Sequence, residues 1–208
     1  MNFFTNKLLV TSLCLLALAG GYGAARLNDL RTAPPAVQNA TELNIPRPLP
    51  QFVLIDHDGQ RFTNDKLLNQ WSILFFGFTN CPDVCPTTLS VLKNVYTHIV
   101  SLKSAVAPQI YLVSVDPQRD TPEKLASYVQ FFHPGFVGLT GSEEAIDAFA
   151  NAVGVARNRV PLEQGQYTVD HTSALFFIDP EGRTAAISSA PHVPGIIADD
   201  FLTIAGKR

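Results

Sequence analysis

The chain alternates between short apolar runs and segments in which apolar residues recur at helical spacing. Residues 72–78, SILFFGF, are apolar and partly aromatic and lie between polar residues, a pattern typical of a strand buried on both faces. Residues 86–102 have helical spacing, and residues 109–115, QIYLVSV, again have the pattern of a buried strand. A strand, a helix and a second strand in this order predict a βαβ unit.

Hairpins are predicted at both ends of the region with this alternation. Residues 51–62 contain a DHDG turn between two short strands, and residues 173–188 contain a PEG turn. Residues 155–169 have no clear period and are predicted to be a mobile insertion, and a closing helix is expected near residues 194–205. The fold class that follows is α/β, a thioredoxin-like fold in which helices flank a central mixed β-sheet.

Two further helices have clear start signals. Thr121 followed by Pro122 predicts an N-cap and a first helical position. Ser142, followed by two acidic residues, predicts the start of another helix, which ends at Gly154. The short apolar run FVGL separates these two helices and is predicted to be a further strand.

The first 31 residues differ in composition from the rest of the chain. No charged residue occurs from Leu8 to Ala25, and Lys7 and Arg26 flank this run. Its length suits a membrane span or a long signal sequence, and we expect an uncleaved N-terminal membrane anchor over residues 1–31. Because no arginine precedes residue 26, a mitochondrial transit peptide is disfavoured. The expected location is the bacterial inner membrane, with the folded domain in the periplasm.

Residues 32–50 contain five prolines and no hydrophobic period, so they are predicted to form an extended tether. The folded domain would then span residues 51–208, a length that suits a single core. The first 50 residues contain four of the 15 basic and two of the 18 acidic residues, which leaves the domain with a net charge of −5 and no basic run. Nucleic acid is therefore not expected as a partner.

Two cysteines follow the strand at residues 72–78, in the sequence NCPDVCP. Proline disfavours helical angles in the residue before it, so the helix is predicted to begin at Pro86, with Cys85 at the N-cap. There the free N–H groups and the positive end of the helix dipole would lower the pKa of the thiol. Cys81 lies in the preceding loop. Both sulfurs are expected beyond the carboxyl end of a central strand, where α/β proteins usually bind ligands.

Three interpretations of the cysteine pair remain open. A structural disulfide across so short a loop would restrict the unfolded chain little, a catalytic dithiol would perform thiol–disulfide exchange, and two thiolates could bind a metal ion. A metal site needs a third ligand. His171 is the candidate, because it stands at the mouth of an apolar strand, where a polar side chain is costly. The other histidines are expected to be exposed or to stabilise loops; these are His57, His98, His133 and His192.

Two thiolates and an imidazole suit a copper or a zinc ion. A structural zinc site would need a fourth cysteine or histidine, and none is evident nearby in the sequence. Met1 is the only methionine, so a blue-copper site with an axial thioether is excluded. Three ligands with an open position favour a site that accepts and hands on Cu(I), or that holds Cu(II) more loosely.

Four separated stretches carry a resemblance to a known family. They read FFGFTNCPDVCPTTL, VSVDPQRDTPE, FVGLTG and VDHTSALFFIDPEGR. Together they are similar to the Sco/SenC family of copper-binding assembly factors for cytochrome c oxidase. The resemblance implies a thioredoxin fold with an N-terminal membrane anchor, and copper bound by Cys81, Cys85 and His171. It also places Asp116 in a signature loop, where we expect it either to support the metal site or to shape the turn.

The resemblance also implies a function. We expect a membrane-tethered copper metallochaperone that delivers copper to the binuclear copper site of cytochrome c oxidase during assembly. Its partners would be the copper-receiving subunit of the oxidase and, as donor, another copper chaperone. The alternative is a thiol–disulfide oxidoreductase that reduces the cysteines of that site, with Cys81 and Cys85 as catalytic residues. A thiol peroxidase is disfavoured, because no arginine adjoins the cysteines in the sequence.

Overall fold

The computed structural model describes residues 16–23 and 36–207, and the chain divides into two units after Pro35. In the first unit, residues 16–23 are helical. Within the described residues, no helix combines the length and the apolar character that a membrane span needs. Most of the anchor expected over residues 1–31 lies outside the described residues, so the anchor stays a prediction.

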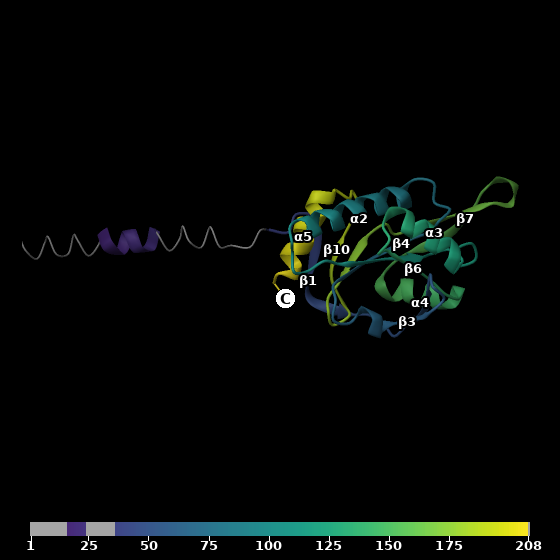
Figure 1. Ribbon diagram of the computed structural model, residues 1–208, viewed down its shortest axis with the longest axis horizontal. Coiled ribbons are helices and arrows are strands. Elements are labelled where there is room, and N and C mark those ends of the chain that lie inside the picture. Colours follow the sequence, from purple (N-terminus) through teal and green to yellow (C-terminus); the bar gives the residue numbers. More distant parts are fainter. Residues whose placement is uncertain (1–15, 24–35, 208) are drawn as a thin grey trace, which may run out of the picture. The chain divides into compact units, whose positions relative to one another are not determined.

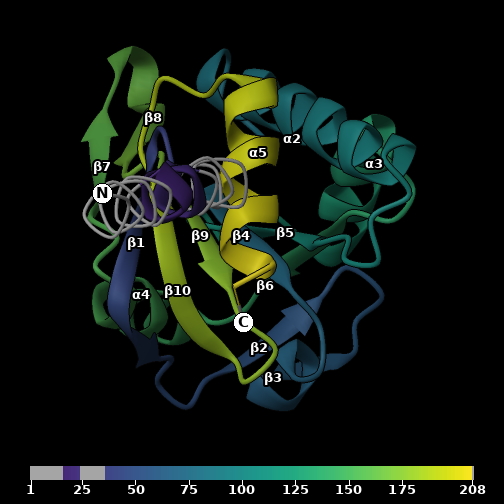
Figure 2. The ribbon, with the colours of Figure 1, turned by 90° about the vertical axis from the view of Figure 1, so that its left-hand side faces the viewer.

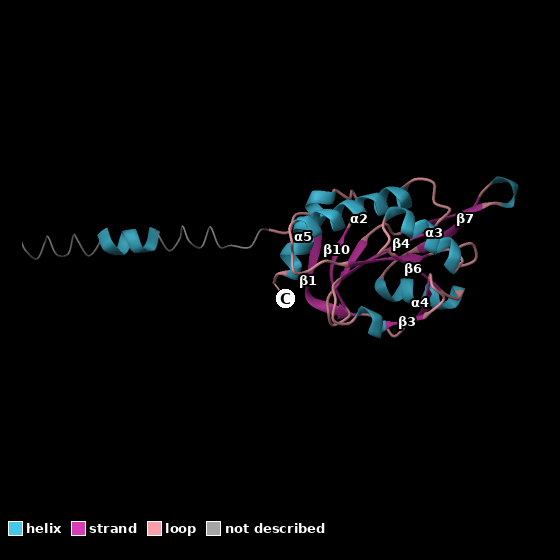
Figure 3. Cartoon of the chain, in the orientation of Figure 1, coloured by secondary structure: helices cyan, strands magenta, loops and turns pink. Residues whose placement is uncertain are grey.

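The second unit contains two β-sheets with helices packed around the larger one (Figures 1 and 3). Its strands are β1 (Ala40–Pro48), β2 (Val53–Asp56), β3 (Arg61–Thr63), β4 (Ser72–Gly77), β5 (Gln109–Ser114), β6 (Val137–Thr140), β7 (Arg157–Pro161), β8 (Tyr167–His171), β9 (Leu175–Ile178) and β10 (Arg183–Ser188). Its α-helices are α2 (Val84–Ser101), α3 (Pro122–Phe132), α4 (Glu143–Val153) and α5 (Pro194–Ala205). Short 3₁₀ helices lie at Asn64–Leu67 and Glu163–Gly165.

The larger sheet has eight strands in the order β1-β10-β9-β4-β5-β6-β2-β3. The strands β4, β5 and β6 run parallel, whereas the remaining neighbours in this sheet pair antiparallel. Phe75 of β4 lies opposite Leu112 of β5 on one side and Leu175 of β9 on the other. All residues of β4 are buried, which explains the continuous apolar run, because helices cover both faces at this point. The predicted mixed sheet is confirmed.

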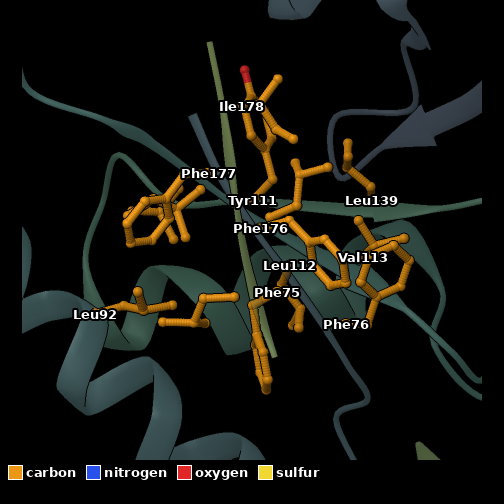
Figure 4. Close-up of a cluster of buried hydrophobic side chains, with 14 of the residues drawn as sticks. Phe75, Phe76, Leu92, Tyr111, Leu112, Val113, Leu139, Phe176, Phe177 and Ile178 are labelled. Atoms are coloured by element: carbon orange, nitrogen blue, oxygen red, sulfur yellow. The ribbon is translucent and has the colours of Figure 1, made fainter. Parts of the chain in front are cut away.

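The core lies on both faces of the central strands, where successive side chains point to opposite sides. Phe76 packs against Phe149 of α4, with 5.7 Å between ring centroids. On the other face, Trp71 and Phe177 each pack against Phe201 of α5, with 5.7 Å between centroids. Figure 4 shows Phe76 and Phe177 on opposite sides of the strands. The two faces hold β4 rigidly, and the cysteine loop begins where β4 ends.

The helix caps predicted at Thr121, Ser142 and Gly154 are confirmed. The Thr121 hydroxyl accepts a hydrogen bond from the N–H of Lys124 at 3.4 Å, and the Ser142 hydroxyl accepts one from the N–H of Ala145 at 3.2 Å. Gly154 ends α4 with a φ of 83°, in the left-handed region that favours glycine. The closing helix spans the predicted residues 194–205.

The extended tether predicted over residues 32–50 is wrong for residues 40–48, which form the strand β1. This strand pairs antiparallel with β10 at the edge of the large sheet. Prolines are tolerated in β1, because an edge strand leaves part of its N–H groups without a partner strand. The missing hydrophobic period has a separate cause, since this edge strand buries little of its surface. Asp200 of α5 also accepts hydrogen bonds from the N–H groups of Gln38, Asn39 and Ala40, at 2.6, 2.8 and 2.7 Å. The compact unit therefore begins at Ala36 and not at Gln51.

The insertion predicted over residues 155–169 is also wrong, because most of it forms the hairpin of β7 and β8. This hairpin is a separate two-stranded sheet, and Figures 1 and 2 show it projecting from the rest of the domain. Arg157 lies opposite His171 in the hairpin and forms ion pairs with Asp147 and Glu143 of α4. The hairpin is thus fastened partly by charges, which is why its sequence shows no apolar period.

Candidate metal centre

The cysteine loop joins β4 to α2. The helix begins at Val84 with Asp83 as N-cap, so Cys81 lies in the loop and Cys85 in the first turn. Both cysteines are free thiols, and the N–H of Cys85 donates to Sγ of Cys81 at 3.4 Å. The helix predicted from Pro86 begins two residues earlier, because proline in the first turn lacks only an N–H that has no partner within the helix.

The sulfur of Cys85 lies against the end of β4. Cys85 is 0% exposed, and a Cβ added to Gly77 would stand 3.0 Å from its Sγ and 3.1 Å from Cδ1 of Leu112. Glycine at position 77 therefore leaves the space that the sulfur fills. Burial raises the pKa of Cys85, and a hydrogen bond from the backbone of Phe78 offsets this only in part. The prediction of a lowered pKa at an N-cap is wrong, and Cys85 is a neutral thiol at neutral pH.

We expect the two thiols to differ strongly in reactivity towards iodoacetamide, which reacts with the thiolate. Cys81 is half-buried and open to solvent, whereas Cys85 is buried and has a raised pKa. Cys81 in the folded, reduced chain should be alkylated at least about tenfold faster than Cys85. Mass spectrometry after partial labelling gives the ratio, and labelling in denaturant, where both thiols react alike, is the control. Equal rates in the folded chain would contradict the buried position of Cys85.

The strand β8 brings His171 to the cysteines from 86 residues along the chain. Its Nε2 lies 3.6 Å from Sγ of Cys85, and its ring packs edge-on against Phe75 and Phe78. The Nδ1 atom lies 3.1 Å from the carbonyl oxygen of Thr172. A carbonyl can only accept, so Nδ1 carries the proton and Nε2 presents its lone pair to the sulfur. Burial lowers the pKa of His171, which keeps the ring neutral.

A cleft of about 250 Å³ separates the cysteine loop from β8. Cys81 and Val84 line one side, and residues 168–171 line the other. Cys81 therefore faces the same cleft as His171. Among the described residues, no three histidine, cysteine or acidic side chains already stand in a metal-binding group. Of the three predicted ligands, Cys85 and His171 are in contact. Cys81 lies next to Cys85, because its Sγ accepts a hydrogen bond from the N–H of Cys85.

Asp116 connects the end of β5 to β8. Its buried carboxylate pairs with Arg119 and accepts a hydrogen bond from the hydroxyl of Tyr167 at 2.8 Å. The guanidinium of Arg119 lies 3.8 Å from the ring centroid of Tyr167, and its Nη1 donates to the carbonyl oxygen of Tyr167 at 2.9 Å. Tyr167 is the first residue of β8 and His171 is the last. Asp116 thus holds the strand that carries His171.

Asp120 holds the cysteine loop in a similar way. Its buried carboxylate accepts hydrogen bonds from the N–H and the hydroxyl of Thr79, at 3.1 and 2.6 Å, and from the hydroxyl of Ser114 at 2.7 Å. Burial raises the pKa of Asp120, and these hydrogen bonds oppose the shift. Thr79 stands two residues before Cys81. This role of Asp120 was missed from the sequence, because no sequence signal pairs Asp120 with Thr79.

Three of the other histidines have hydrogen-bond partners away from the cysteines. Nδ1 of His133 accepts a hydrogen bond from the N–H of Gly135 at 3.0 Å, and His133 is half-buried rather than exposed. Nδ1 of His57 accepts a hydrogen bond from the N–H of Gly138 at 2.9 Å, and its side chain is 7% exposed, so the expectation of an exposed His57 is wrong. His98 is exposed, as expected. Nε2 of His192 lies 2.8 Å from the carbonyl oxygen of Ser173, which fits its expected role in a loop.

Comparison with known proteins identifies relatives over most of the folded domain. The model of the SCO1/SenC family matches residues 43–205. The human mitochondrial SCO1 homologue is 41% identical over 133 residues, which cover 64% of this chain and 44% of that protein. A SCO2-like protein of Rickettsia prowazekii is 40% identical over 134 residues, which cover 64% of each chain. The match thus spans less than two thirds of the length of these two relatives.

Solved structures also resemble the domain. The crystal structure of Arabidopsis thaliana ScoI with copper bound has a TM-score of 0.73 at 34% identity, and the match covers 76% of this chain and 98% of that chain. The solution structure of apo Sco1 from Thermus thermophilus has a TM-score of 0.70 at 36% identity, covering 79% and 95%. These matches confirm the thioredoxin-like α/β fold. Since the family model spans nearly the whole folded domain, the chain belongs to the SCO1/SenC family.

Proposed function

We propose that the chain carries copper, binds it through Cys81, Cys85 and His171, and delivers it to the binuclear copper site of cytochrome c oxidase. The observation that carries the proposal is the 3.6 Å contact between Sγ of Cys85 and Nε2 of His171, which folding creates across 86 residues. The copper-bound structure of the Arabidopsis relative supports the choice of metal.

The donor set suits copper on chemical grounds. Two sulfurs and a neutral imidazole nitrogen are ligands that Cu(I) prefers, and the lone pair of His171 already faces the sulfur of Cys85. Because burial raises the pKa of Cys85, the ion must displace a proton from that thiol when it binds. Affinity should therefore fall as the pH falls, since protons compete with copper for the thiolates.

We place the domain in the periplasm of a bacterium, held by an N-terminal anchor over residues 1–31. The uncharged run from Leu8 to Ala25 supports this placement, because its length suits a membrane span. The copper-receiving subunit of the oxidase would then be the partner that accepts the ion, and a second copper chaperone would be the donor.

The test compares copper binding by the parent, His171→Ala and His192→Ala. His171→Ala should lose about a hundredfold or more in Cu(I) affinity and should change the spectrum of the Cu(II) form, because one of three ligands is removed. His192→Ala is the matched control, since this ring bonds to Ser173 near the same strand and should not affect binding. Competition with a coloured Cu(I) chelator measures both. If His171→Ala bound copper like the parent, the three-ligand site would be wrong.

A second candidate function is reduction of the cysteines of the oxidase copper site. The position of Cys81 favours it, because this thiol faces the cleft and accepts a hydrogen bond from the N–H of Cys85. Cys81 would attack the partner disulfide, and Cys85 would displace the partner thiol and leave a Cys81–Cys85 disulfide, which a periplasmic thiol reductant must reduce again. His171→Ala should keep this exchange activity while losing copper, so the same variant separates the two functions.

A further inference from the structure

An apolar groove lies beside the cysteine loop, between the start of α2 and the helix α3. These two helices are neighbours in both views of the domain (Figures 1 and 2). The groove has a volume of about 490 Å³, which exceeds that of the cleft beside His171. Its lining includes Thr79, Pro86 and three aromatic residues of α3, which are Tyr128, Phe131 and Phe132. We call it the α3 groove.

The α3 groove is continuous with the cysteine loop. Thr79 precedes Cys81 by two residues, which span at most about 7 Å. Pro86 directly follows Cys85. Burial raises the pKa of the Tyr128 hydroxyl, and electrostatic interaction with Cys85 and Cys81 raises it further, so the hydroxyl lies near both sulfurs. A segment bound in the α3 groove would therefore lie against the loop that carries the cysteines.

The wall of the α3 groove has two features that packing alone does not explain. The ring of Phe131 is 81% exposed, although it packs edge-on against the buried Phe132, with 5.2 Å between centroids. The hydroxyl of Tyr128 is buried, and among the described residues it has no hydrogen-bond partner. An exposed aromatic ring beside an apolar hollow, with an unpaired hydroxyl in the wall, costs free energy in a surface that binds nothing. Both features are typical of a binding surface.

We infer that the α3 groove holds a large apolar side chain of the partner protein, a few residues from the partner cysteine that meets Cys81. The inference rests on the proposed function, because copper transfer and disulfide reduction both bring a partner sulfur to Cys81. The distance from Thr79 to Cys81 limits the spacing, so an anchor two to four residues from the partner cysteine can reach the groove. A permanent occupant, such as a second copy of this chain, would lie against the loop that both functions need free.

The test uses the reduced full chain and nine-residue peptides whose central cysteine is a mixed disulfide with thionitrobenzoate. The thiolate of Cys81 attacks the peptide sulfur, forms a new disulfide and expels the coloured thionitrobenzoate anion, whose absorbance gives the rate. The reference peptide has glycine at the other positions. Each further peptide has one leucine, placed two, three or four residues before or after the cysteine. Reaction with free mercaptoethanol corrects for the intrinsic reactivity of each peptide.

The expected result is that leucine accelerates the reaction at particular positions only. At one or two of them the corrected rate constant should exceed that of the glycine peptide about fivefold or more, because the leucine side chain leaves water in the α3 groove. Glutamine at the same position has a similar size and is the matched control, with the rate of the glycine peptide expected. Equal rates for all peptides would overturn the inference, as would equal acceleration by leucine at every position.

The variant Phe131→Gln tests the α3 groove from the protein side. It removes the exposed ring and keeps a good helix former, so the ratio of the leucine rate to the glycine rate should fall from about five to about one. Val100→Gln is the matched control, because Val100 is 49% exposed on α2 and does not line the groove, so the parent ratio is expected. The ratio is taken within each variant, which cancels any change in the reactivity of Cys81. A parent ratio in Phe131→Gln would contradict binding in this groove.

Light scattering tests whether a second copy occupies the α3 groove instead. The parent and Phe131→Gln should have the same mass in solution, because the proposed occupant is a partner protein that is absent from the sample. A parent dimer that Phe131→Gln converts to a monomer would show that this face binds a second copy, and the inference would then be wrong.

Copper titration of the parent separates a failure of this inference from a failure of the proposed function. Copper bound by the three ligands without position-dependent acceleration by leucine would refute the docking groove and leave the carrier function standing. Such acceleration in a chain that binds no copper at these residues would refute the carrier function and support the docking groove for thiol exchange.

Discussion

Replacing Cys85 by serine should lower the affinity for Cu(I) by about a thousandfold or more, which corresponds to about 4 kcal/mol. Serine has nearly the same shape, but its hydroxyl stays protonated and is a hard ligand, which Cu(I) disfavours. The position of Cys85 makes the loss large. Its sulfur contacts His171 at 3.6 Å, and its N–H bonds to the sulfur of Cys81, so Cys85 stands between the other two ligands.

The measurement is competition with a Cu(I) chelator, together with the thermal stability of the metal-free chain. The unfolding temperature should change little, because the serine hydroxyl can donate to Nε2 of His171 in place of the thiol. A folded Cys85→Ser variant with parent affinity would show that copper binds elsewhere on the chain. An unfolded variant would be recognised by its loss of the cooperative transition, and Cys85→Ala would then replace it in the titration.

Replacing Asp120 by alanine should lower the free energy of unfolding by about 2–4 kcal/mol. The change leaves the N–H and hydroxyl of Thr79 and the hydroxyl of Ser114 without their acceptor in a buried place. Each such group costs about 1–3 kcal/mol when water cannot replace the lost partner. Because Thr79 precedes Cys81 by two residues, copper affinity should fall as well. Urea denaturation of the metal-free chain measures the stability.

Asp120→Asn is the matched control for this network. Its amide oxygen can accept from the N–H of Thr79 and from Ser114, and its amide nitrogen can donate to the hydroxyl of Thr79. We expect its stability within about 1 kcal/mol of the parent. Burial raises the pKa of the Asp120 carboxyl in the folded chain, so the parent loses stability as the pH rises through that pKa. The asparagine side chain does not titrate. The free energy of unfolding of Asp120→Asn relative to the parent should therefore be higher at neutral pH than in acid. Equal stability of the alanine and asparagine variants would rule out a supporting role for these hydrogen bonds.

The elements that could be predicted are those whose own residues indicate how they are buried or how they begin and end. The strand β4 is buried on both faces, so its apolar run is visible without knowledge of its neighbours. Thr121 and Ser142 could be assigned because a cap is a local hydrogen bond within a few residues. The strand β1 could not be predicted, because distant residues hold it in place. It pairs with β10, and the N–H groups beside it bond to Asp200, more than 100 residues away.

The sequence could nominate residues for the candidate site but could not give their geometry. His171 was singled out because a polar residue at the mouth of an apolar strand needs a reason, and the structure places it beside Cys85. The burial of Cys85 depends on Gly77 and Leu112, which the cysteine motif does not report, so the direction of its pKa shift was predicted wrongly. The role of Tyr167 as the partner of Asp116 was missed for the same reason, because only the folded chain brings the two together.

The division of the ligands between two sheets has a consequence for the lifetime of a bound ion. The cysteines follow a strand of the eight-stranded sheet, whereas His171 ends a strand of the separate hairpin. A displacement of the hairpin would leave every ladder of the large sheet intact, but it would break the contacts with Arg119 and α4 and the core packing of Val169. Coordination would then drop from three to two before the cargo departs. If the chain carries copper as proposed, the residence time of the ion would depend on displacement of this hairpin, a kinetic property that equilibrium affinity does not report.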